Sequence, residues 1–458
     1  MGWITLIPAF AAVGIAVWRK DVFLALPIAI WLSETLIAGY NPAAGLLASI
    51  DRLAEVFTSE GNARVILFCI LVGGLIALMQ RSGGVSAFVA LLTRSGAVNS
   101  PRRAGLFAWA LGLFLFVETN LSLLGSGVAS RGLFDHFKLS RARLAYIIDS
   151  TSAPVSVILM FNAWGAFVLG LIAAQPTVSA PVPTLVGAAA LNFYAILALL
   201  MALFVAASGR AHFTLRRHEE RAEAAGGAAD MEVQEAPTKA RYMLVPMAVL
   251  IALIFFFMWR TGDGNILQGS GSRSILWAMS IAALVAILML VFERRYSFKE
   301  AMAVNLDGMA HLLPAVGVLV LAIALSASFQ DLGVGAFVAS VVSPETPGFL
   351  VTPLVFLAAC VIAFTTGTSW GTFAIMIPIA MPLAPVFDLP AALVLAAILG
   401  GGVFGDHCSP ISDTTVVASL AAGVDHVDHV RTQLPYALIA GAAATVLYAL
   451  AGLLLGGG

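Results

Sequence analysis

The sequence predicts an all-α polytopic membrane protein built as an inverted-topology repeat, with about ten transmembrane helices, two re-entrant hairpins and two broken helices. The first observation is composition. Of 458 residues, 60% are apolar and 11% are charged, against roughly a quarter charged in an average soluble domain. The second is the recurrence of apolar runs that can cross a bilayer. The third is the presence of two apolar regions with polar centres. This composition excludes a soluble enzyme and a disordered chain, and the net charge of −1 provides no basic surface for nucleic acid.

The apolar runs define the expected spans. The first begins without a basic segment and ends at Arg19-Lys20, which is typical of a retained helix and not of a cleaved signal peptide. The three cysteines have no paired spacing, so we expect neither a disulfide framework nor a zinc site. The spans lie at residues 3–18, 22–38, 63–79, 144–173, 184–207, 242–259, 274–292, 312–329, 391–422 and 433–455.

The basic residues predict the orientation. Loops rich in Lys and Arg lie in the cytoplasm, whereas 174–183 and 343–349 contain neither residue and are expected outside, as are both termini. Region 104–130 has basic residues at both ends, which a hairpin entering from the cytoplasm satisfies and a single crossing does not. Region 350–387 is expected to be a second hairpin that enters from outside. Irregular backbone at membrane depth must be covered by protein or line a cavity, so both polar turns should face a site.

A hydrophilic segment divides the chain into two halves. Residues 208–241 hold six Lys or Arg and six Asp or Glu, and we interpret them as a cytoplasmic linker. The flanking halves, 1–207 and 242–458, each contain a hairpin and a broken helix, expected at 144–173 and 391–422. Because the halves start on opposite sides of the membrane, they form an inverted repeat, an architecture common in secondary transporters.

Acidic residues inside apolar sequence are the candidate ion- or proton-binding groups, because an ionised carboxylate at the bilayer centre costs about 2.5–3.5 kcal/mol. Prolines Pro154 and Pro410 follow two of these acids and free backbone carbonyls. Carboxylate, carbonyl and hydroxyl oxygens suit a small hard cation, although an Asp before a broken helix can also act as a helix cap. The candidate acids are Asp149, Asp406, Asp413 and Glu118, and the candidate supporting ligands are Ser150, Thr151, Ser152, Thr366, Thr368, Ser369, Ser409, Ser412 and Thr414.

Histidines and tryptophans near these acids have two interpretations each. His407 is either a proton-sensing neighbour of Asp406 or a polar group bonded to a carbonyl. His426 and His429 are expected in a solvated cytoplasmic turn. Trp164 and Trp370 either line the site or pack against a hairpin.

The motifs around the acids resemble a known family. The eleven residues GDHCSPISDTT at 405–415 resemble the signature of the NhaC-type sodium/proton antiporter family, and TGTSWGT at 366–372 is similar to its preceding motif. The segment 149–154 (DSTSAP), followed by NAWG at 162–165, is similar to the first-half counterpart. The resemblance extends from about residue 60 to 450. It implies an elevator-type transporter of the ion-transporter superfamily, with Asp149, Asp406 and Asp413 at the ion site.

The resemblance therefore implies a secondary transporter, and no enzyme, that exchanges sodium for protons. We expect competition of the two ions at buried carboxylates, no cofactor, and no metal other than Na⁺. Its partners would be Na⁺, H⁺ and the lipid of a bacterial inner membrane, and the resemblance also allows a homodimer. The alternative is a sodium- or proton-coupled exchanger of a small organic anion such as malate or lactate, or of an amino acid. We find no Arg or Lys within the hairpin turns or breaks, which favours a cation.

Overall fold

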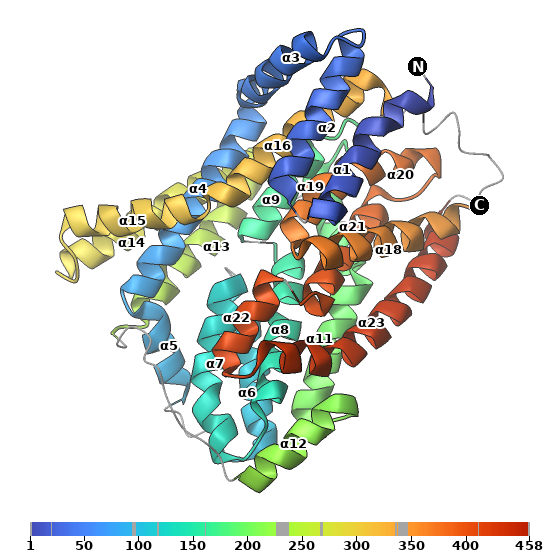
Figure 1. The fold of residues 1–458 in the computed structure, drawn as a ribbon. Helices are drawn as coiled ribbons and strands as arrows, with labels where there is room; N and C mark the ends of the chain where they lie inside the picture. The colour runs from blue at the N-terminus through green and yellow to red at the C-terminus, as the bar shows by residue number, and fades with distance from the viewer. Residues whose placement is uncertain are drawn as a thin grey trace.

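The chain folds into a bundle of helices in the computed structural model, which describes residues 2–19, 21–93, 98–116, 119–160, 162–225, 238–265, 269–334, 337, 347–410 and 412–456 (Figure 1). The first half contains η1 (Trp3–Leu6), α1 (Ile7–Arg19), α2 (Val22–Ile37), α3 (Pro42–Glu55), η2 (Val56–Thr58), α4 (Glu60–Arg81), α5 (Gly84–Thr93), α6 (Pro101–Phe114), α7 (Thr119–His136), α8 (Arg141–Ile158), α9 (Ala163–Ala173), α10 (Pro181–Ala190) and α11 (Phe193–Ser208). The rest contains α12 (Phe213–Ala225), α13 (Arg241–Thr261), α14 (Gly271–Phe292), α15 (Phe298–His311), α16 (Leu313–Leu332), η4 (Gly348–Leu350), α18 (Val351–Thr366), α19 (Ser369–Ala380), α20 (Leu383–Val386), α21 (Ala391–Cys408), α22 (Asp413–Ala422) and α23 (His426–Leu455).

The predicted fold class is confirmed. Within the described residues every regular element is a helix, and eight helices are long and apolar enough to cross a membrane, or up to eleven if each bent pair forms one span. The first predicted broken helix is α8 and α9, which meet at 43°, and the second is α21 and α22. The predicted hairpins correspond to α6 with α7 and to α18 with α19. Gly367 ends α18 with a φ of 68°, a left-handed conformation that glycine adopts without strain.

Several helices were not expected from the apolar runs. Helices α3, α5 and α15 fall between predicted spans, and the region predicted as one span at 184–207 is divided into α10 and α11. Helix α3 turns away from α2 by 119°. It exposes Leu46, Leu47 and Ile50 while Gly45 and Ser49 are buried, and this amphipathic pattern lacks the continuous apolar run of a span.

Helices α4 and α15 approach each other closely. A Cβ added to Gly73 would lie 2.2 Å from the carbonyl oxygen of Gly308, and a Cβ on Gly308 would lie 2.3 Å from the carbonyl oxygen of Gly73. Small residues of this kind permit close packing of membrane helices. The contact is made within one chain, so these glycines are engaged in the fold itself.

Two hydrophobic clusters organise the interior, and they meet along α8, α23 and the second broken helix. The smaller cluster contains Ile147, Ala418 and Tyr436, whereas the larger contains Val157, Val403 and Ala440. In Figure 1 the helices of the smaller cluster (α6, α7, α8, α11, α12 and α22) lie together in the lower half of the molecule. Buried polar residues occupy the junction, and we name this group the polar seam: Asp149, Asp406, His407, Thr415, His429 and Gln433.

Candidate functional site

The break in the first broken helix is organised by one asparagine. Asn162 caps α9 by accepting a hydrogen bond from the backbone N–H of Gly165 at 3.0 Å. Its amide nitrogen donates to the carbonyls of Leu159 at 2.7 Å and Ser156 at 2.9 Å. One side chain therefore satisfies backbone groups on both sides of the break, which an interrupted helix at membrane depth requires.

The break in the second broken helix is held by contacts from α22 and α23. The hydroxyl of Thr415 donates to the carbonyl of Asp406 at 2.7 Å, and His426 Nε2 lies 2.6 Å from the carbonyl of Pro410. Ser412 and Thr414 pair through their hydroxyls at 3.0 Å. The last carbonyls of α21 carry the negative end of a helix dipole, which favours a cation at this place.

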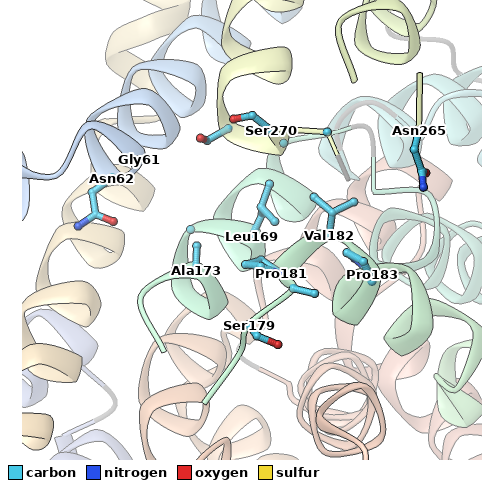
Figure 2. A pocket seen from close by; sticks show the side chains of 15 residues that line it. Gly61, Asn62, Leu169, Ala173, Ser179, Pro181, Val182, Pro183, Asn265 and Ser270 are labelled. Carbon is cyan, nitrogen blue, oxygen red and sulfur yellow. The ribbon is translucent and has the colours of Figure 1, made fainter. Parts of the chain in front are cut away.

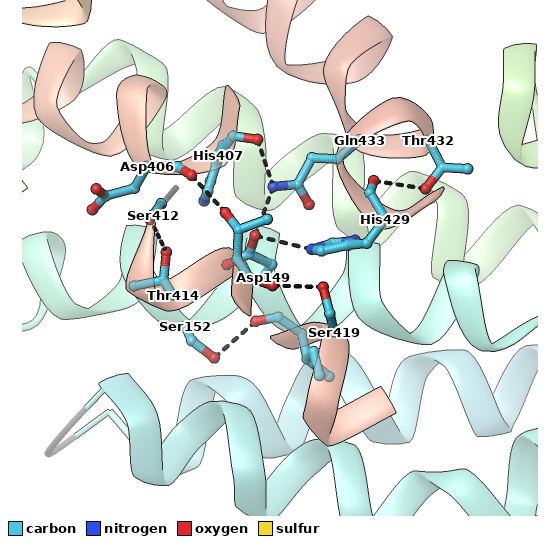
Figure 3. Close-up of polar contacts among 12 residues, drawn as sticks. Asp149, Ser152, Asp406, His407, Ser412, Thr414, Ser419, His429, Thr432 and Gln433 are labelled. Carbon is cyan, nitrogen blue, oxygen red and sulfur yellow. Dashed lines mark hydrogen bonds and ion pairs between the residues drawn. The ribbon is translucent and has the colours of Figure 1, made fainter. Parts of the chain in front are cut away.

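Asp149 lies at the centre of the polar seam. It is fully buried in α8, and its Oδ2 accepts a hydrogen bond from Gln433 Nε2 at 2.7 Å and lies 3.2 Å from His429 Nε2. Figure 3 shows both partners extending from α23 toward the carboxylate. A carboxylate buried so completely needs such donors, because desolvation of the charged group is expensive.

The two broken helices are joined through Gln433. Its Nε2 also donates to the carbonyl of His407 at 2.9 Å, so one amide group contacts Asp149 in the first half and the end of α21 in the second. His407 Nδ1 in turn lies 2.9 Å from the hydroxyl of Tyr194 on α11. His407 is buried, and both of its interpretations, a proton-sensing neighbour of Asp406 and a bonded polar group, stay predictions.

The predicted hydroxyl ligands divide into two groups. In α8, Ser152 pairs with Ser122 of α7 at 2.8 Å, and Thr151 donates to carbonyls of its own helix, while Ser150 is buried beside them. Thr119 of α7 also pairs with Ser156 of α8 at 3.1 Å, so the first hairpin is attached to α8 by two hydroxyl pairs. In the second half, Ser409 is fully buried in the break between α21 and α22.

The second hairpin brings its motif against α21. Thr366 ends α18 and donates to the carbonyl of Ile362 at 2.8 Å, and Thr368 caps α19, whose first residue is the buried Ser369. The two motif tryptophans meet, because Trp164 of α9 and Trp370 of α19 have ring centroids 5.7 Å apart. The rings therefore pack between a broken helix and a hairpin, and their lining of an ion site stays a prediction.

Two predicted acids cannot be placed in the site by their side chains. Glu118 lies outside the described residues, and Asp413 begins α22 but its side chain is outside the described part. Asp406 is fully buried in the last turn of α21. Asp149 is also buried, yet it does not occupy the equivalent place, because α8 continues to Ile158, well beyond it.

The structure adds a finding on Pro154 and corrects the expectation for His429. Pro154 lies inside α8 and does not mark the break, since the chain continues as a helix for another turn and Asn162 supplies the caps. The expectation that His429 lies in a solvated turn is wrong: α23 begins at His426, seven residues before the predicted span, and His429 is fully buried. Gln433 was missed altogether. Its signal was its place one turn after His429, which puts both on one helix face.

The helix from the linker covers a buried arginine. The side chain of Arg143 in α8 is only 3% exposed and pairs with Glu219 of α12 at 3.1 Å. Glu219 also accepts a hydrogen bond from Ser140, the N-cap of α8, at 2.7 Å. Helix α12 contacts α23 as well, through the hydroxyl of Thr214 and the carbonyl of Arg431 at 2.9 Å.

A cavity of about 690 Å³ lies apart from the polar seam, among the N-terminal ends of α4, α10 and α14. Figure 2 shows Asn62, Ser179 and Ser270 around it. All residues that line it are uncharged, so it brings none of the predicted acids into contact with solvent.

Comparisons with known proteins agree with this architecture. A family model described as the Na⁺/H⁺ antiporter family matches residues 144–453. An uncharacterized protein of Haemophilus influenzae is 31% identical over 98% of this chain and 90% of its own length. The malate-2H(+)/Na(+)-lactate antiporter of Bacillus subtilis is 32% identical over 39% of this chain and 38% of its own.

A solved structure supports the fold alone. The crystal structure of the YdaH transporter of Alcanivorax borkumensis matches with a TM-score of 0.59 and 15% identity, over 89% of this chain and 88% of that one. At that identity the likeness extends to the arrangement of helices and not to the residues of a site.

Proposed function

The chain belongs to the Na⁺/H⁺ antiporter family, and from this membership we propose that it exchanges Na⁺ for H⁺ across a bacterial inner membrane. Membership confirms the resemblance carried by the sequence motifs and makes the protein a transporter and not an enzyme. The observation that carries the ion assignment is the burial of Asp149 and Asp406, both inaccessible to solvent, beside the interrupted helices.

The proposed mechanism is competition at these carboxylates. An ionised carboxylate binds Na⁺ through its oxygens, and a protonated one cannot, so either ion displaces the other. With an ion bound the site is nearly neutral and inexpensive to move through a low-dielectric region, whereas an empty site carries a charge that opposes movement. Exchange then needs no separate coupling device.

The contacts between halves support an inverted repeat with halves 1–207 and 242–458. Helix α9, the end of the first broken helix, packs against α19 of the second hairpin, and α22, the end of the second, packs against α7 of the first hairpin. Two-fold related repeats make equivalent contacts of this kind.

The topology that we propose has both termini outside, so a reporter domain fused at either end should be located in the periplasm. A cytoplasmic reporter signal at one end would contradict this topology. A homodimer stays a prediction, which native mass spectrometry would test.

A second candidate function is exchange of a small organic anion. The antiporter of Bacillus subtilis named for malate and lactate matches part of the chain, and Nε and Nη2 of the buried Arg143 have no hydrogen-bond partner among the described residues. A carboxylate substrate would satisfy such a guanidinium. Glu219 already neutralises Arg143, however, so we favour cation exchange.

A vesicle experiment separates the two functions. Inverted membrane vesicles that contain the protein are energised, and a pH-sensitive dye reports the proton gradient while NaCl, KCl, LiCl or potassium malate is added. Na⁺/H⁺ exchange predicts dye recovery with NaCl alone. Recovery that requires malate or lactate would refute it.

Variants assign the response to the polar seam. Asp149→Asn and Asp406→Asn should abolish recovery while the protein still inserts in the membrane. Asp307→Asn is the matched control, because Asp307 is exposed and pairs with Arg81 at the surface. Full exchange by both buried-site variants would exclude these carboxylates as the ion site.

A further inference from the structure

The orientation of the Gln433 amide is fixed by its neighbours. Its nitrogen lies 2.7 Å from Asp149 Oδ2 and 2.9 Å from the carbonyl oxygen of His407. Both neighbours only accept hydrogen bonds, so the group between them must be the NH₂, and its two hydrogens are both used. The carbonyl oxygen, Oε1, is therefore directed elsewhere.

Two oxygens in this group have no partner. Gln433 Oε1 and Asp149 Oδ1 lack a hydrogen-bond partner among the described residues, although both side chains are completely buried. Buried polar atoms in folded proteins are nearly always satisfied by protein, water or an ion. The 2.7 Å hydrogen bond keeps the two side chains in direct contact, so both free oxygens belong to one buried polar group.

The chemistry of the pair indicates a cation. A carboxylate oxygen and an amide carbonyl oxygen are hard donors, which favour Na⁺ over soft transition metals. The described residues contain no group of three His, Cys, Asp or Glu that would hold such a metal. His407 Nε2 and His429 Nδ1, also without partners in the described part, can bond to waters that complete the coordination.

We propose that Gln433 is a further ligand of the transported cation, and that its Oε1 and Asp149 Oδ1 bind that cation together. The proposal rests on the proposed function, and it adds α23 to the elements that form the ion site. Gln433 then has two roles: its nitrogen orients Asp149 and its oxygen contacts the ion. Since both roles come from one amide, a leucine of similar size removes the ligand without leaving a large void.

The test compares Gln433→Leu with Thr432→Val in purified protein reconstituted in proteoliposomes. Thr432 is equally buried, and within the described part of the chain its hydroxyl donates to the carbonyl of His429 in the same helix. We expect Gln433→Leu to raise the KM for Na⁺ by about 10-fold or more, because loss of even an outer-shell partner of a metal has that effect. The ratio of the KM values for Na⁺ and Li⁺ should change too, and Thr432→Val should alter neither quantity.

The outcomes are distinct. An unchanged KM, or equal increases for Na⁺ and Li⁺, would show that Gln433 only positions Asp149 and would overturn the proposal. If the variant fails to fold, electron cryo-microscopy of the wild type in NaCl and in choline chloride decides instead. Density between the two oxygens in NaCl alone supports the cation, and the same density in both salts indicates water and overturns it. Failure of the proposed function would appear separately, as wild-type vesicles without Na⁺-driven proton movement.

Discussion

Gly405 is required by the contact between α21 and the second hairpin, and replacing it with alanine should disrupt that contact. A Cβ at this position would lie 2.1 Å from Cβ of Ala363 and 2.6 Å from the backbone nitrogen of Phe364. Ordinary van der Waals contact begins at 3.4 Å, so the two helices would have to separate by more than an ångström. The obstructing atoms belong to the backbone of α18 or are attached directly to it, so no side-chain rotation relieves the clash.

The magnitude follows from two opposing effects. Overpacking costs about 1–3 kcal/mol, and a rigid obstacle places this site near the upper end. Alanine in a helix recovers about 0.5–1 kcal/mol relative to glycine. We therefore expect Gly405→Ala to lower the free energy of unfolding by about 2 kcal/mol. Because Asp406 is the next residue, Na⁺-driven exchange should decrease as well.

Gly132 provides the matched control. It lies in α7, and a Cβ added there has no neighbour within 4 Å, so Gly132→Ala should be neutral or stabilising by up to about 1 kcal/mol. Equilibrium unfolding of the purified proteins in detergent measures both, and the dye assay measures exchange. A Gly405→Ala protein as stable and active as the wild type would show that α18 does not pack on α21 in this way.

Three further predictions follow from other contacts. Glu219→Gln leaves the buried Arg143 without an anionic partner and should destabilise the protein by about 3 kcal/mol or more. The control Glu220→Gln, at an exposed pair with Arg216, should cost about 0.5 kcal/mol or less. Equal effects of the two variants in unfolding experiments would contradict the burial of the Arg143–Glu219 pair. Ser122→Ala and Ser152→Ala should each lower the free energy of unfolding by about 1 kcal/mol, and a double-mutant cycle should give a coupling energy of about 0.5 kcal/mol or more. The control cycle combines Ser122→Ala with the distant Ser280→Ala, for which we expect additivity. Additive effects of Ser122→Ala and Ser152→Ala would exclude direct pairing of these two serines. Lys239, Tyr242 and Arg241 lower the pKa of Glu293 from 4.5 to about 2. Ionised Glu293 therefore stabilises the native state above about pH 4.5, and this contribution is lost as the pH falls toward 2. The midpoint of thermal unfolding of Glu293→Gln should depend less on pH in that interval than that of the wild type, and identical pH profiles of the two proteins would refute this role of Glu293.

The hairpins and broken helices could be predicted because polar residues interrupt otherwise apolar runs, and a bilayer tolerates such interruptions only where protein covers them. The position of the first break could not. Pro154 frees a backbone carbonyl, but a helix can retain a proline when neighbouring groups satisfy that carbonyl. The break is organised by Asn162, whose side chain bonds to the end of α8 and the start of α9. The hydropathy pattern does not mark this asparagine.

The contribution of α23 was missed for a different reason. Asp425, Asp428 and Arg431 make the segment before residue 433 look like a solvated loop. The structure shows instead that Asp425 caps the helix by accepting from the backbone N–H groups of Val427 and Asp428, so the charged residues lie on the outer face of its first turns. His429 and Gln433 occupy the inner face. Their partners are distant in sequence, and no local pattern encodes the contact with Asp149.

The docking of α12 determines where the chain can be divided. A cut after Ala225 would leave this helix attached to the amino-terminal fragment, with Glu219 still on Arg143 in the same polypeptide, whereas the hydrogen bond of Thr214 to α23 would join the two fragments. A cut before Phe213 would transfer the helix to the other fragment, and the ion pair would then have to form between separate polypeptides. Co-expressed halves should therefore reassemble more readily from the first design. The segment after α11 therefore contacts both halves of the chain and is more than a tether.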